Sequence, residues 1–198
     1  MTVRAGLLLD RFGAPETGPT YGQIMTELSR RALLRSAVAG AALAGSLAVR
    51  VGPAAASVQN YWRYCDRCHV MFFDGYPDKG VCQAGGGHVA NGYYFTLPYD
   101  VPATPNDQPY WRYCTRCHAM FFNGYTDKGA CPSGGGHHAQ GYQFVLPHDV
   151  AGTPSQQSDW RYCRKCHVMF FDGYEQKGLC PGGGGHWSEG YMFVLPHL

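Results

Sequence analysis

One unit of sequence occurs three times in this chain of 198 residues, and its cysteines and histidines limit what the chain can fold into. The unit begins at Trp62, Trp111 and Trp160, a period of 49 residues. Between Trp62 and Pro98, 23 of 37 positions are identical in all three copies. Each copy holds three of the nine cysteines. Because an odd number of thiols cannot be closed by disulfides within one copy, this count favours another use for them.

The spacing of these residues predicts a metal site in each copy. Each has Cys-x2-Cys, then thirteen residues and Cys, then five residues and His. Three thiolates and one imidazole form a closed tetrahedral set of the kind that holds structural zinc. We therefore expect about three zinc ions per chain. The predicted ligands are Cys65, Cys68, Cys82 and His88; Cys114, Cys117, Cys131 and His137; and Cys163, Cys166, Cys180 and His186.

A haem attachment signature competes with zinc in the same stretch. Residues Cys65 to His69 also read Cys-x-x-Cys-His, which is the signature of haem c, and the other copies repeat it. This histidine would then be one axial ligand, with Met71 or His88 as the other, but Cys82 would have no role. In the zinc interpretation the same histidine lies just outside the metal ligands, hydrogen-bonded near a thiolate. The histidines concerned are His69, His118 and His167.

Disulfides formed after export are a third use of the thiols, with no metal at all. Nine thiols would leave at least one unpaired, and a bridge within Cys-x2-Cys stabilises little. Copper(I) on a thiolate-rich site is a further, minor alternative. Some such cross-link is needed, because a copy of about 40 residues is near the size at which an apolar core alone no longer suffices.

The pattern after residue 57 predicts an all-β fold. No apolar period of 3.6 residues is present there. Short strands are expected at Tyr61–Cys65, His69–Phe73 and Tyr93–Leu97, with a turn at Asp74-Gly75. Tyr93, Phe95 and Leu97 should share one face of the last strand, and Pro98 should end it.

The repeats divide the chain into residues 57–105, 106–154 and 155–198. Proline-rich and polar joints separate the repeated units at 98–109 and 147–159, a composition typical of semi-extended linkers. These joints favour three separate β-hairpin, zinc-ribbon-like beads. The alternative is a β-trefoil-like closure of the three repeats.

The first 56 residues have the marks of a leader. Arg30 and Arg31 belong to a stretch that resembles the twin-arginine (Tat) export motif, followed by an apolar run at 37–49. That run is shorter than the ~20 residues that span a bilayer, so we expect a signal helix rather than an anchor. Ala54 and Ala56 form a small-residue site, which predicts cleavage after Ala56.

The leader also offers a second start residue. Met25 lies closer to the arginine pair than Met1 and is a candidate for the true start.

The leader predicts where the protein acts as well. The Tat resemblance implies export of an already folded chain, whose thiols can take a metal in the reducing cytoplasm. The expected mature protein is secreted, with the export machinery as a transient partner and no membrane association after cleavage.

Charge excludes two classes of partner. Of the sixteen basic residues, six precede residue 57, and the remainder of the chain holds ten basic and eleven acidic residues. A nearly neutral region lacks the basic surface that binds nucleic acid or an anionic membrane.

Aromatic residues are more numerous than three small cores can hide. We expect Tyr76 with Lys79, and Tyr93, to form an exposed patch, since tyrosine combines an apolar ring with a polar tip. The candidate ligand surface is Tyr76, Lys79, Tyr93, Tyr125, Lys128, Tyr142, Tyr174, Lys177 and Tyr191.

The region 57–198 resembles a Cys/His-rich tandem repeat of secreted bacterial proteins. The resemblance rests on Trp-Arg-x-Cys-x-x-Cys, Phe-Phe-x-Gly, Gly-x-Cys and Gly-Gly-x-His, and the opening is also similar to zinc-ribbon and zinc-knuckle families. It implies a secreted repeat module and no particular activity.

Repetition argues against an enzyme, because any chemistry carried by repeated residues would be present three times, whereas an enzyme usually has one site of unlike groups. The unrepeated His138, His148 and Glu189 form no evident acid–base set, and closed zinc sites do not activate water. We expect a non-enzymatic module with several sites for a cell-wall or extracellular polysaccharide, or for a surface protein. The alternatives are a multihaem electron carrier, a disulfide-stapled structural surface protein and a β-trefoil lectin.

Overall fold

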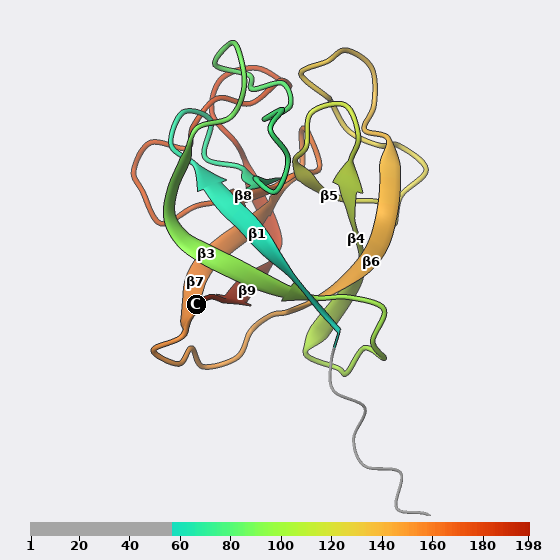
Figure 1. Ribbon diagram of the computed structural model, residues 1–198, viewed down its shortest axis with the longest axis vertical. Helices are drawn as coiled ribbons and strands as arrows, with labels where there is room; N and C mark the ends of the chain where they lie inside the picture. The colour runs from blue at the N-terminus through green and yellow to red at the C-terminus, as the bar shows by residue number, and fades with distance from the viewer. Residues whose placement is uncertain (1–56) are drawn as a thin grey trace, which may run out of the picture. The chain divides into compact units, whose positions relative to one another are not determined.

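The structure is a computed structural model and describes residues 57–198, so the predicted signal, cleavage site and alternative start lie outside it. Nine strands in this range form three antiparallel sheets, without any helix long and apolar enough to cross a membrane (Figure 1). The all-β class and the 49-residue period are confirmed. The strands are β1 (Val58–Cys65), β2 (Met71–Phe73), β3 (Ala90–Pro98), β4 (Asp107–Cys114), β5 (Met120–Phe122), β6 (Ala139–Pro147), β7 (Gln156–Cys163), β8 (Met169–Phe171) and β9 (Ser188–Pro196).

Each copy contributes one sheet whose long first strand lies in the middle. The order is β2-β1-β3, and β5-β4-β6 and β8-β7-β9 repeat it. Trp62 on β1 is paired with Phe73 of β2 on one side and with Phe95 of β3 on the other. The second strand is shorter than predicted because His69 has a φ of 66°, in the left-handed region, and belongs to the preceding turn.

The Met-Phe-Phe strands divide the interior into two layers. Successive side chains of a strand point to opposite faces, so Met71 and Phe73 join a cluster with Trp62, whereas Phe72 joins a second cluster with the cysteines. On β3, Phe95 and Leu97 complete the first cluster. Both clusters draw residues from all three copies, and the repeated tryptophans, Trp62, Trp111 and Trp160, are fully buried in the first.

The copies are not separate beads, so the favoured architecture was wrong in this respect. The amide of Phe73 donates to the carbonyl of His118 in the next copy at 3.0 Å. The equivalent bonds join Phe122 to His167 at 2.8 Å and Phe171 to His69 at 2.9 Å, which closes the ring. The physical reason is burial: three copies that share one core remove from water the aromatic residues that a single copy of this size would leave exposed. Closure of the three repeats was the alternative.

The proline-rich joints fold against their neighbours instead of acting as spacers. Strand β4 begins at Asp107, so the first joint is reduced to residues 99–106. Within it the amide of Asp100 donates to the carbonyl of Gln143 on β6 at 2.8 Å. In Figure 1 the joints lie at one end of the body, and the loops that follow β2, β5 and β8 gather at the other.

Candidate metal centres and joint grooves

Three buried clusters, each with three cysteines and one histidine, bring together the twelve residues that the spacing singled out. In each cluster the four candidate ligand atoms all lie within 4.8 Å of one another. The first holds Cys65, Cys68, Cys82 and His88, the second Cys114, Cys117, Cys131 and His137, and the third Cys163, Cys166, Cys180 and His186.

In the first copy the ligands come from a turn and a loop that the sheet places side by side. Cys65 ends β1, and Cys68 lies in the turn that follows it. Cys82 and His88 lie in the glycine-rich loop before β3, where the amide of Cys82 donates to the carbonyl of Gly86 at 2.8 Å. Gly86 has a φ of 66°, a conformation that costs glycine little and other residues more. The loop can therefore turn tightly enough to return His88 to the cysteines.

The distances within the cluster match a tetrahedral zinc site. The sulfurs of Cys65 and Cys82 are 3.9 Å apart, and the Cys68 sulfur is 3.4 Å from Nδ1 of His88. Zinc bonds of about 2.3 Å to sulfur and 2.0 Å to nitrogen would place such atoms roughly 3.8 and 3.5 Å apart. A disulfide requires about 2.05 Å between sulfurs, and all nine cysteines are free. The geometry therefore fits a metal and not a bridge.

Each candidate histidine ligand is held by the neighbouring copy. Nε2 of His88 donates to the backbone carbonyl of Cys117, 2.9 Å away. This bond fixes the proton on Nε2 and leaves the Nδ1 lone pair facing the sulfurs, the arrangement typical of a metal-bound histidine. The ring also stacks on Phe72 with centroids 4.7 Å apart. The equivalent bonds run from His137 to Cys166 at 3.0 Å and from His186 to Cys68 at 3.0 Å.

Electrostatics in the first cluster call for a cation. Hydrogen bonds from Cys68 and Cys82 lower the pKa of Cys65, whereas the bonds to Cys65 and Cys82 together with burial raise the pKa of Cys68. Burial alone would lower the pKa of His88, but hydrogen bonding to Cys65 and Cys82 raises it to about 9. Without a metal, the buried cluster thus resists a second thiolate, and a second proton on His88, at Nδ1, occupies the place that a metal bond would fill. A divalent ion would remove that resistance and let all three sulfurs ionise.

The histidine after each Cys-x2-Cys does not join the cluster. The ring of His69 packs against Tyr64 of its own copy and Tyr174 of the third copy, with centroids 5.4 and 5.8 Å apart. Its burial lowers its pKa. Nδ1 of His69, His118 and His167 has no hydrogen-bond partner among the described residues. The expected hydrogen bond to a thiolate is therefore not seen at Nδ1, and the two cysteines that haem attachment would use lie in the buried cluster with Cys82 and His88.

The predicted ligand surface is rearranged by the closure. Tyr76 and Tyr93 are about half exposed, as expected, but they lie in different places. Tyr76 lines the same depression as Tyr142 of the second copy, and Tyr93 lines another with Tyr174 of the third. Lys79 is engaged within its own loop, where its ammonium is 2.7 Å from the Asp74 carboxylate and donates to the Tyr76 carbonyl.

Within residues 57–198 these tyrosines line three equivalent depressions between adjacent copies, which we call the joint grooves. Their volumes are about 270, 220 and 340 Å³. The first is lined by Gln59, Phe73, Tyr76, Tyr113, Gln140, Gly141, Tyr142 and Phe144. The second is lined by Gln108, Phe122, Tyr125, Tyr162, Glu189, Gly190, Tyr191 and Phe193. The third is lined by Tyr64, Asn91, Gly92, Tyr93, Gln157, Phe171 and Tyr174.

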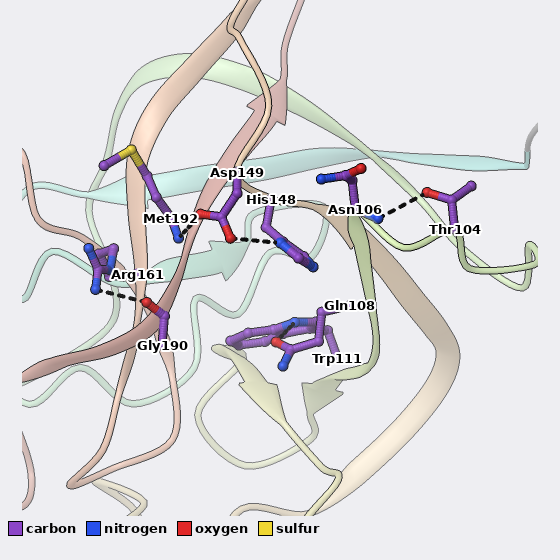
Figure 2. A network of polar contacts seen from close by, with 9 residues as sticks. All are labelled: Thr104, Asn106, Gln108, Trp111, His148, Asp149, Arg161, Gly190 and Met192. Atoms are coloured by element: carbon purple, nitrogen blue, oxygen red, sulfur yellow. Dashed lines mark hydrogen bonds and ion pairs between the residues drawn. The ribbon is translucent and has the colours of Figure 1, made fainter.

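Polar contacts fix the walls of the second joint groove (Figure 2). Gln108 accepts a hydrogen bond from the indole of Trp111 at 3.0 Å, and Arg161 donates to the carbonyl of Gly190 at 3.0 Å. His148 stacks on Tyr191 with centroids 3.7 Å apart. The groove is thus held in shape by hydrogen bonds behind its lining.

Sequence reasoning missed the glutamine of each groove. The residues are Gln59, Gln108 and Gln157. Each lies three positions before a repeated tryptophan, and its oxygen accepts the indole N–H at 3.0 Å. The signal was present as a Gln-x-x-Trp recurring with the 49-residue period, just outside the stretch compared.

A scan against protein-family models finds no match, and neither a search of curated proteins nor a search of solved structures finds one.

Proposed function

We propose that this protein is an exported, non-enzymatic module that three zinc ions stabilise and that binds a cell-wall or extracellular polysaccharide through several equal sites. The observation that supports it best is the threefold recurrence of a tyrosine-lined groove at the joint between copies. Three weak sites on one body bind a polymer far more tightly than one, because the second and third contacts are intramolecular.

Zinc is the metal that suits the clusters. Three sulfurs and one imidazole nitrogen at tetrahedral spacing are its usual structural donor set. With four protein ligands no position remains for water, so the ion would supply cohesion and no catalysis. The loop from Cys82 to His88 contains little apolar surface of its own, and the ion would anchor it to the sheet.

The polar residues support binding over catalysis. His148 lies 3.1 Å from the carboxylate of Asp149, the kind of pair that can assist a nucleophile. Asp149 also accepts a hydrogen bond from the amide of Met192 at 3.1 Å, so the pair fastens the second joint to β9 (Figure 2). Its role there is structural.

Export fits this proposal, although the signal lies outside the described residues. The twin-arginine route, as the resemblance implies, carries folded proteins, and a folded chain can leave the cytoplasm with its zinc already bound. Burial of all nine cysteines would then protect the thiolates in an oxidising environment.

Two measurements on the mature protein, purified without chelator, test the proposal. We expect about three zinc and no iron per chain by elemental analysis, and retention on an insoluble wall or extracellular polysaccharide. Iron in the sample, together with a haem absorption band, would overturn the proposal and indicate an electron carrier. Three zinc ions per chain, no retention on any polysaccharide and capture by a single wall protein would together show that the ligand is a protein and not a polysaccharide.

A further inference from the structure

We propose that each joint groove binds one uncharged pyranose ring of the polysaccharide. This inference rests on the proposed function and adds the position and the chemistry of the ligand. It also implies that no copy carries a complete site, because each groove takes one wall from one copy and the other wall from the next.

The aromatic walls are exposed but firmly held. Tyr76 is 51% exposed and Tyr142 is 41% exposed. Tyr142 stacks on Tyr99 with centroids 3.8 Å apart, and Tyr76 packs edge-on against Phe73 at 5.1 Å. Rings fixed by such contacts lose little conformational entropy when a ligand arrives. They offer flat apolar surfaces against which the C–H face of a sugar ring can pack.

The remaining lining suits the hydroxyl rim of a sugar. Because the oxygen of Gln59 accepts the indole proton of Trp62, its amide protons are turned away from the indole, available as donors. Gln140 adds a second amide, and the hydroxyls of Tyr76 and Tyr142 can donate or accept. A ligand that is apolar on its faces and rich in hydroxyls at its edge matches this combination.

Charge and size narrow the ligand further. None of the groove-lining residues described is basic, which argues against phosphate, sulfate or uronate groups. Glu189 in the second groove is the one acidic residue among them, and Arg164 lies 3.5 Å from it. The volumes lie at or below the low end of the ~300–1,000 Å³ usual for small-molecule sites. The space suits a single ring rather than a helix or a folded peptide.

The test measures retention of the zinc-loaded protein on amorphous cellulose, chitin, mannan and starch, with polygalacturonate as a charged comparison. We expect retention on at least one neutral polymer. Replacing one groove tyrosine, as in Tyr76→Ala, should weaken binding about tenfold, and removing all three should abolish it, because avidity is lost with each site. The triple variant is Tyr76→Ala with Tyr125→Ala and Tyr174→Ala.

The chain supplies its own control. Tyr61 and Tyr110 are 57% and 52% exposed, line none of the three grooves, and correspond to Asp159 in the third copy. Tyr61→Asp with Tyr110→Asp should therefore bind as the wild type does. Zinc content and thermal melting must match the wild type in every variant. If the triple variant fails to fold, the opposite walls are altered instead, by Tyr93→Ala, Tyr142→Ala and Tyr191→Ala.

The outcomes separate this inference from the proposed function. If binding to a neutral polymer survives the loss of either triple set of groove tyrosines, the grooves are not the binding sites. The proposed function as a polysaccharide-binding protein would still stand. Retention on polygalacturonate alone would overturn the neutral ligand. No retention on any of the polymers would overturn both.

Discussion

Replacing Cys82 by serine tests whether the three metal centres depend on one another. The change removes one of four ligands, and structural zinc contributes roughly 10–16 kcal/mol in zinc-finger peptides, compared with a net stability of about 5–15 kcal/mol for a domain. With three ligands left, the first centre should lose its metal to a chelator that the intact centre resists. If the loop then loosens, His88 no longer bonds to Cys117. If the turn at Cys68 loosens with it, His186 of the third cluster loses its acceptor, the Cys68 carbonyl.

These contacts set the expected magnitude in the other two copies. Loss of the group that orients a ligand histidine typically lowers metal affinity about 10–100-fold, so the third centre should weaken by this amount. Loss of the His88 bond would also leave the buried carbonyl of Cys117 unpaired. An unpaired buried carbonyl costs about 1–3 kcal/mol, so the second centre, to which Cys117 belongs, should also weaken. Cys82→Ser should therefore retain fewer than two zinc ions at a chelator concentration that leaves the wild type with about three.

The assay is a titration with a chromophoric zinc chelator, followed by thermal unfolding monitored by circular dichroism. Pro77→Thr is a matched control, since copy two has Thr126 at this exposed position. We expect one unfolding transition at a lower temperature for Cys82→Ser. Two zinc ions held with wild-type affinity and a separate transition for the first copy would refute the coupling.

Three further substitutions and the removal of zinc test the packing of the described body and its candidate metal centres. Gly80 and Gly92 both have positive φ, but a Cβ at Gly80 would lie 2.4 Å from the Cys117 carbonyl and one at Gly92 would meet nothing within 4 Å. Gly92→Ala should thus cost about 1–2 kcal/mol and Gly80→Ala more than that, a difference that denaturant unfolding can measure. Phe72→Ala removes a fully buried ring that stacks on His88; we expect a loss of about 3–5 kcal/mol in the same assay and weaker zinc binding in the chelator titration. An unchanged unfolding midpoint would contradict that packing role. Stripping zinc from the wild type should lower the melting temperature in a single transition, and added zinc should restore it; a zinc-free protein that melts as before would show that the clusters are not structural.

The candidate metal clusters were predictable because their signal is local. Cys65 and Cys68 are joined by one tight turn, and the glycines before His88 allow the loop to return, so spacing alone groups the four residues. The strands were predictable for the same reason, since the aromatic residues around Trp62 follow a period of two. His69 departs from the pattern with a positive φ in the turn that carries Cys68, and Tyr61, with a φ of 70°, interrupts the regular pairing of β1 with β3.

The grooves were not predictable because their walls come from residues far apart in the chain. Tyr76 and Tyr142 are 66 positions apart in sequence, and no spacing rule places them together. Their neighbourhood depends on closure of the ring, which the proline-rich joints argued against. The composition of the first joint gave no sign that Tyr99, at its start, packs on Tyr142 and fixes the joint to the second copy.

The loop between β2 and β3 explains why a metal and a groove would be combined in one unit. Lys79 joins them: its ammonium donates to the carbonyl of Tyr76 at 2.7 Å, and its own carbonyl accepts from the amide of His88 at 3.1 Å. A zinc ion that holds His88 would thereby also hold the backbone that presents Tyr76. The loop has no strand of its own, so without such an anchor its backbone would be among the least stable parts of the body, although the ring of Tyr76 packs on Phe73. A metal at this cluster would thus serve the proposed groove as well, because it would steady the loop backbone on which the ring of Tyr76 is mounted.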